Sequence, residues 1–461
     1  MTALMLLLAT LAVELVVPFI AWHWIQRPFP GFLLEHTLVI SDVMGNDWDK
    51  SFRSGALWRL TEIEGQPVET GRDVMQWMGR VAPGDVLDVT LVARPDSGLG
   101  QQIRETTAQK FPVRDWIIIF WLPYGIALGY LGIGAWVFFH RGDRAAGQSF
   151  ALFCASVALA VSLLFDADTT HIFSRLWTAA LPLAAASLVH LALVFPERGP
   201  FVNRWPAVRF LPYALAAPVM LISQIRLYDP TDPWAYVTHW RWSYAALGTA
   251  VVVFFLIMLY TRAHSVSEVT RRQVRIILAG ALLSFGPITL YFILAGVPVT
   301  IAFQPAIYLP PLIIFPLFIA YAILRYKLLG MDLLITRGLA YTILTAGIVG
   351  VYVFVLAVLG QTMGFEVQGG PVALALATII LLFVLNPLRE RVERIVDRIL
   401  DRQRLDYRQM LQQFSRDLVT TPLELPAILD RLLAQIDPVV HSAPAVVLIH
   451  DPLSDRYLIE L

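Results

Sequence analysis

The chain has 461 residues, of which 57% are hydrophobic and only 15% are charged, and its mean hydropathy is +0.64. This composition is too apolar for an ordinary soluble domain and indicates a protein whose partner is a lipid bilayer. The formal net charge of zero argues against a nucleic-acid-binding protein, and the single cysteine, Cys154, excludes a disulfide scaffold and a cysteine-rich metal site. We expect no metal and no cofactor.

About ten segments are long and apolar enough to cross a bilayer, which requires roughly 20 residues. They lie at 3–24, 115–139, 149–165, 173–195, 210–226, 243–261, 276–296, 304–324, 338–361 and 371–388. The first is interpreted as an uncleaved anchor, residues 1–26, rather than as a signal peptide, because no basic residues precede its apolar run. The predicted fold is a mainly α membrane protein, a polytopic helical bundle over residues 114–388.

Arginines and lysines gather in alternate loops between these segments. The basic loops contain Arg141 and Arg144, then Arg198, Arg204 and Arg209, then Arg262, Arg271, Arg272 and Arg275, then Arg325, Lys327 and Arg337. The intervening loops contain almost none, and the loop near Tyr228 to Trp242 has only Arg241. Because basic side chains are retained in the cytoplasm, both termini are predicted to be cytoplasmic and residues 27–113 extracytoplasmic.

Residues 27–113 have the composition of a soluble domain. Alternating apolar residues at 38–40, 57–63 and 86–92 predict strands of a small sheet, and Gly65-Gln66-Pro67 predicts a turn. A short helix is expected to begin at Thr70 or Gly71 and to place four apolar residues on one side, Val74, Met75, Trp77 and Met78.

The run from Leu60 to Val68, the segment Asp73-Val74-Met75 and the segment from Pro83 to Arg94 resemble a PDZ domain. The resemblance implies an α+β fold in which a glycine-rich loop captures a peptide carboxylate. Pro30-Gly31-Phe32-Leu33 occupies the place of that loop, which makes Gly31, Phe32 and Leu33 candidate ligand-binding residues. Ser54-Gly55-Ala56 replaces the usual Gly-Asp pair, so a structural or ligand-gating role is the alternative.

The bundle contains no catalytic motif, and no catalytic residue is proposed. His190 lies inside a predicted span, where an ionisable residue is a candidate for function; the alternative is a neutral imidazole that hydrogen-bonds a neighbouring helix. Breaks such as Gly286-Pro287 and Pro310-Pro311 indicate either a binding pocket or simple kinks.

A cytoplasmic signalling helix is predicted over residues 389–436. Apolar residues with coiled-coil spacing occur in two series, Leu388, Val392, Ile395 and Ile399, then Tyr407, Leu411, Phe414 and Leu418. They predict a homodimer, and an amphipathic surface helix is the alternative. Residues 437–461 predict two strands at the start of a further domain that the chain does not complete.

Three motifs together resemble the input half of bacterial membrane sensor histidine kinases of the competence quorum-sensing type. They are the segments His190 to Arg198, Tyr321 to Asp332 and Asp397 to Leu418. The resemblance implies a location in the bacterial inner membrane, a GAF domain after the signalling helix, a peptide or small-molecule signal, and a downstream kinase and response regulator. No histidine of the chain lies in a phospho-accepting motif, so this chain alone is not expected to phosphorylate a partner. A polytopic transporter and a PDZ-bearing membrane scaffold are the alternatives.

Overall fold

The computed structural model describes residues 2–41, 43, 48, 57–142, 144–295, 309–325, 447–451 and 456–460. Two units divide the chain, Met1–Leu382 and Phe383–Leu461, and each is described by itself. The predicted spans 338–361 and 371–388, the Ser54 to Ala56 segment and the whole predicted coiled coil lie outside the described residues.

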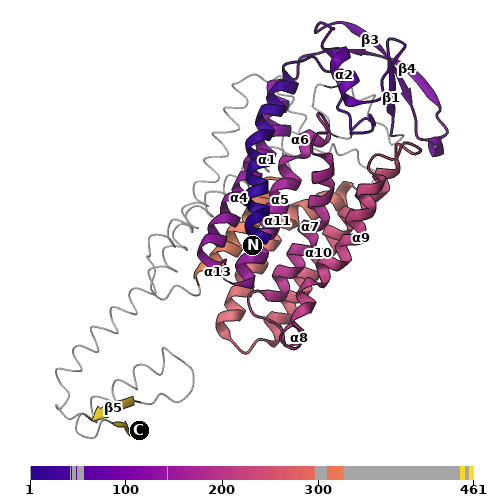
Figure 1. Cartoon of the computed structure of the whole chain (residues 1–461). Helices are drawn as coiled ribbons and strands as arrows, with labels where there is room; N and C mark the ends of the chain where they lie inside the picture. The colour runs from indigo at the N-terminus through magenta and orange to yellow at the C-terminus, as the bar shows by residue number, and fades with distance from the viewer. Residues whose placement is uncertain are drawn as a thin grey trace. The chain divides into compact units, whose positions relative to one another are not determined.

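The described part of the chain is mainly helical (Figure 1). Six of its helical segments are long and apolar enough to cross a membrane, and they match the first six predicted spans. Four of them are single helices: α1 (Thr2–Ile25), α5 (Ala145–Ser162), α7 (Ser174–Val194) and α10 (Ala235–His264). The segment Val113–Arg141 comprises α3 (Val113–Trp116), a π-helical turn (Ile117–Trp121) and α4 (Leu122–Arg141). The segment Pro206–Arg226 ends in α9 (Leu211–Arg226). The prediction of a polytopic membrane protein is confirmed at this level, and the count of ten stays a prediction.

Two further helices overlap the seventh and eighth predicted spans. α11 (Glu268–Ala295) also includes Arg271, Arg272 and Arg275 of the basic loop before the predicted span, and α13 (Ile314–Arg325) is a shorter apolar helix that covers the second half of the eighth. α10 begins at Ala235, so His239 and Trp240 lie on a helix and not in the predicted loop. The longer α11 arises because arginine is as favourable in a helix as the apolar residues that follow it.

α5 and α7 are the most buried of the six spans. α5 packs against α1, α4 and α7, while α10 packs against α7 and α9. Small residues permit this close packing: a Cβ on Gly134 of α4 would lie 2.5 Å from the Cβ of Cys154 on α5. The helices therefore form one packed bundle around α5 and α7.

The part of residues 27–112 that the structure describes, here called the sheet domain, contains a four-stranded antiparallel sheet and one α-helix. The strands are β1 (Arg59–Ile63), β2 (Gln66–Pro67), β3 (Val86–Val92) and β4 (Gln101–Thr107), in the order β2-β1-β3-β4. α2 (Gly71–Met78) begins where the sequence predicts, because Thr70 and Asp73 form a reciprocal capping box.

Three details of the sheet domain differ from the predictions. The predicted strand at 38–40 is not a strand, because Val39 and Ile40 form only isolated bridges, to Arg59 and Leu34. The turn between β1 and β2 is formed by Glu64 and Gly65, with φ of 49° and 71°, so Gln66 and Pro67 belong to a strand. Strand β4 was not predicted at all. A small α+β domain is confirmed, whereas the PDZ resemblance stays a prediction.

In the C-terminal unit, β5 (Val447–Asp451) pairs antiparallel with β6 (Arg456–Glu460). The register pairs Val447 with Glu460 and Asp451 with Arg456. This agrees with the two strands that the sequence predicts there.

Candidate functional site

The sheet domain contacts the bundle through a set of buried polar groups, which we call the joint. Its residues are His36 and the neighbouring Leu34 and Glu35 on the sheet domain, with Asp168, His171, Leu227 and Tyr236 on the bundle. Leu34 to Ile40 form a small hairpin, since Leu34 and Ile40 form a β-bridge and Glu35 N–H donates to the Val39 carbonyl at 2.8 Å. The hairpin places these side chains against the ends of the helices.

His36 is a buried polar group of the joint, with 6% of the residue exposed. Its ring lies against Tyr228, Tyr236 and Trp240, with centroids 4.9, 4.5 and 5.4 Å away. Its Nε2 donates to the Leu227 carbonyl at 2.6 Å, because a carbonyl can only accept. The other nitrogen, Nδ1, is buried and has no hydrogen-bond partner among the described residues. The imidazole therefore fits this place only in its neutral form.

His171 makes the reciprocal contact from the bundle. Its Nε2 donates to the Leu34 carbonyl at 2.7 Å, while the Leu34 N–H donates to the Asp168 carbonyl at 3.2 Å. Both polar backbone groups of Leu34 are thus bonded to the loop between α6 (Leu164–Ala167) and α7. Asp166 holds this loop, because its carboxylate accepts from the N–H groups of Ile172 at 3.1 Å and Phe173 at 2.8 Å.

Two further hydrogen bonds and an apolar layer complete the joint. The Tyr236 hydroxyl donates to the Glu35 carboxylate, and the Trp234 indole N–H donates to the Leu57 carbonyl at 2.8 Å. One continuous apolar cluster includes Trp24 of α1, Phe29 of the sheet domain and Trp240 of α10. The sheet domain is therefore held against the bundle by burial as well as by hydrogen bonds. We call this arrangement the seated state.

Burial shifts the titration of both joint histidines. It lowers the pKa of His36 to about 3, with the nearby His171 and Arg175 adding to the effect, and it lowers the pKa of His171 to about 4. Burial also raises the pKa of Asp166, against the opposing hydrogen bonds from Thr170 and the loop amides. Both histidines are neutral at pH 7.

Comparison with family models, curated proteins and solved structures finds no match to this chain. The joint is therefore interpreted from its own chemistry. Its groups include no nucleophile paired with a base, and their hydrogen bonds are made to one another across the two parts. Such an arrangement holds two parts together and depends on the protonation state of two histidines.

The candidate peptide-binding residues lie next to the joint. Phe32 and Leu33 are each 1% exposed, and their side chains belong to the apolar clusters of the sheet domain and the joint. Gly31 has a φ of +81°, and a Cβ there would lie 2.7 Å from Gln109 Nε2. The groove between this segment and α2 retains a cavity of about 30 Å³, and Asp168, Thr169 and His171 line it. In this structure the bundle's own loop forms one wall of the groove.

His190 lies far from the joint. It stands sixteen residues beyond the start of α7 at Ser174, which corresponds to roughly 24 Å along a helix at about 1.5 Å per residue. Its Nδ1 contacts the Tyr213 hydroxyl at 3.1 Å, and its ring packs on Phe210. This is the interhelical hydrogen bond that the sequence offers as the alternative to a ligand site.

Sequence reasoning missed the joint itself. Leu34, His36, Leu227 and Tyr236 were not candidates, because the partners of each bond are far apart in the chain. The available signal is the aromatic segment that follows Asp232, whose tryptophans are equally typical of a membrane interface. Trp240 is instead 7% exposed and stacks edge-on against Trp177 at 4.5 Å.

Proposed function

We propose that this chain is a membrane-embedded signal input module of the sensor histidine kinase kind. The sheet domain would lie outside the bacterial inner membrane, and both termini would be cytoplasmic. The observation that supports this best is the pairing of Leu34, through its N–H and its carbonyl, with the loop between α6 and α7. A signal that moves the sheet domain acts directly on the loop that joins α5 to α7.

The mechanism that we propose is a shift between two packings of the bundle. A signal can drive such a shift only if it binds one packing better than the other. The joint suits this role because His36 and Leu34 keep their buried hydrogen bonds only when the sheet domain is seated. A peptide or small molecule that displaces the loop from the groove beside α2 would stabilise the unseated state.

The signal would pass from the bundle to the cytoplasm through the predicted signalling helix. Residues 388–418 would pair in a homodimer, and their rotation or shift would act on a GAF domain and on a downstream kinase and response regulator. The sequence pattern of Leu388, Val392, Ile395 and Ile399 supports the dimer.

Gly71→Ala tests the relay from the joint. A Cβ at Gly71 would lie 2.7 Å from Nδ1 of His171, whereas alanine is otherwise favourable in the first turn of α2. The variant should therefore disturb the joint and leave the sheet domain folded. Ile103→Ala, at an exposed position of β4, is the matched control.

The readout is disulfide formation between cysteines placed singly at 388–418 in the full chain in membranes. The natural Cys154 is buried and does not interfere. We expect periodic crosslinking, whose pattern changes about fivefold or more at individual positions in Gly71→Ala and not in Ile103→Ala. If hydrogen exchange shows that Gly71→Ala opens the joint and the crosslinking pattern still does not change, the relay is refuted. Solute flux through vesicles that contain the chain would instead favour the transporter.

A further inference from the structure

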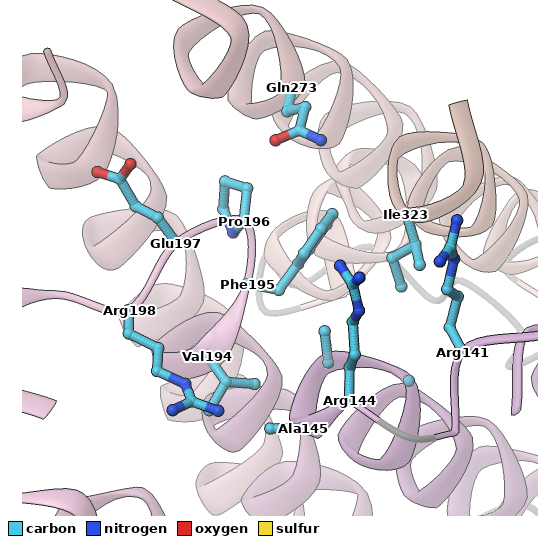
Figure 2. A pocket seen from close by; sticks show the side chains of 12 residues that line it. Arg141, Arg144, Ala145, Val194, Phe195, Pro196, Glu197, Arg198, Gln273 and Ile323 are labelled. Atoms are coloured by element: carbon cyan, nitrogen blue, oxygen red, sulfur yellow. The ribbon is translucent and has the colours of Figure 1, made fainter. Parts of the chain in front are cut away.

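A cavity of about 530 Å³ opens at the opposite ends of α5 and α7 from the joint. The α4–α5 corner, the segment after α7, α11 and α13 form its walls (Figure 2). Its lining residues are Arg141, Arg144, Ala145, Ala146, Gly147, Val194, Phe195, Pro196, Glu197, Arg198, Gln273 and Ile323. The volume lies within the range of small-molecule sites.

The α4–α5 corner holds two arginines on one wall. Arg141 ends α4, and Arg144 precedes the first residue of α5. The two helices meet closely, because a Cβ on Gly147 would lie 2.1 Å from the Arg141 carbonyl oxygen. Gln148 fastens the corner by donating from Nε2 to the Gly142 carbonyl at 2.9 Å. The backbone of this corner thus places both arginines at the cavity.

The facing wall adds Arg198, while its neighbour Glu197 is engaged elsewhere. The Glu197 carboxylate accepts from the hydroxyls of Ser265 at 3.3 Å and Thr270 at 3.1 Å, in the connection between α10 and α11. In Figure 2 the Glu197 carboxylate points away from the arginines. The Arg144 side chain lies between those of Phe195 and Ile323 in this view. Within the described residues, Arg141 and Arg198 form no ion pair with a carboxylate.

We propose that this cavity, lined by Arg141, Arg144 and Arg198, binds a phosphate-bearing anion. Guanidinium groups match phosphate oxygens in pairs, and three of them around one cavity favour a compact anion over a neutral ligand. The start of α5 adds to the attraction, because its first-turn amides donate no hydrogen bond to an N-cap side chain and carry the positive end of the helix dipole.

The anion can come from two sources, a phospholipid headgroup or free phosphate. The cavity lies where α4 and α7 end and α5 begins, at the depth of the headgroups when these helices cross a bilayer. A phosphodiester held there would lie in a cavity whose walls both carry arginines. The apolar lining residues Val194, Phe195 and Ile323 offer a surface for the glycerol and the start of an acyl chain.

Isothermal titration of the purified full chain in phosphatidylcholine nanodiscs tests the proposal. The probes are dihexanoyl phosphatidylglycerol, dihexanoyl phosphatidylcholine and inorganic phosphate, each at constant ionic strength. The pocket variant changes Arg141, Arg144 and Arg198 to glutamine. The matched control changes three exposed arginines at the same end, Arg204, Arg262 and Arg271, and so removes the same charge.

We expect saturable binding of the anionic probe at one site per chain. Affinity should fall about tenfold for each arginine lost, and the control should bind as the natural chain does. Tighter binding of phosphatidylglycerol than of phosphate identifies a lipid site, and equal binding identifies a soluble anion. Binding of neither anion, or equal loss in the control, overturns the proposal. Arg144→Lys keeps the charge and serves as a control for misfolding. It should bind the anion more tightly than Arg144→Gln does.

Discussion

Acidification should release the sheet domain from the bundle, because His36 and His171 bind a proton less readily in the seated joint than after release. Burial lowers the pKa of His36 to about 3 and of His171 to about 4, whereas both have an ordinary pKa of 6.5 once released. The released state therefore binds protons first as the pH falls. The seated state has its full stability relative to the released state above about pH 6.5. Below this pH its stability falls, until the histidines of the seated state also bind protons near pH 3 to 4.

The size of the effect follows from proton linkage. Each depressed histidine weakens seating by about 1.4 kcal/mol per pH unit below 6.5. At pH 5.5 the two together remove about 3 kcal/mol, roughly a 100-fold change in the ratio of seated to released molecules. Asp166 acts in the opposite direction at lower pH, because burial raises its pKa, so the comparison stops at pH 5.5.

Hydrogen exchange at the Leu34 amide measures this equilibrium, since that N–H is bonded to the Asp168 carbonyl in the seated state. Protection, corrected for intrinsic exchange rates, should fall steeply from pH 7.5 to 5.5. A variant with His36→Gln and His171→Gln retains side-chain donors without titrating in this range, and it should give a flat profile. Equal protection of the natural chain at both pH values, or an equal fall in the glutamine variant, would show that these histidines do not control seating.

Two substitutions probe the two ends of the bundle. Trp234→Phe removes the donor to the Leu57 carbonyl and should weaken seating by about 1–2 kcal/mol, visible as faster exchange at Leu34 with an unchanged thermal unfolding of the sheet domain. Gly147→Ala places a Cβ 2.1 Å from a backbone oxygen of the α4–α5 corner and should lower the thermal stability of the bundle, whereas Gly248→Ala in α10, with no atom within 4 Å, should leave it unchanged or slightly raised. Equal melting temperatures for the two glycine variants would contradict the packing at that corner.

Hydropathy was sufficient for the six spans that the structure describes but not for the sheet edge. A helix that crosses lipid must satisfy its own backbone, so a long apolar run predicts the helix without knowledge of its neighbours. Strand β4 has no such local signal, because Gln101 to Thr107 is polar and mostly exposed. It exists through its pairing with β3, in which Val86 lies opposite Thr107 and Val92 opposite Gln101. The capping residues Thr70 and Asp73, by contrast, gave the start of α2 from local chemistry alone.

The joint could not be predicted for a related reason. His36 and Leu227 are 191 positions apart, and no periodicity connects them. A lone histidine in an apolar hairpin has many explanations until its partner is known. The candidate residues Gly31, Phe32 and Leu33 show the same limit: a local motif suggested a ligand loop, and only the tertiary structure places the bundle's own loop beside it.

The joint and the anion cavity are connected by the same two helices. α7 begins at Ser174, beside the loop that contacts Leu34, and ends at Val194, which lines the cavity. α5 runs the opposite way, from Ala145 at the cavity to Ser162 near the joint. Because both are buried in one packed bundle, they move as rigid bodies more easily than they bend.

Linkage then requires a reciprocal effect between the two ends. If seating of the sheet domain changes the spacing of α5 and α7, it changes the affinity of the cavity for its anion, and the anion changes seating by the same factor. Adding dihexanoyl phosphatidylglycerol should therefore alter the protection of the Leu34 amide in the natural chain and not in the variant that lacks the three cavity arginines. An anion that binds without altering Leu34 protection would mean that the two ends of the bundle act independently, and that α5 and α7 carry no signal between them.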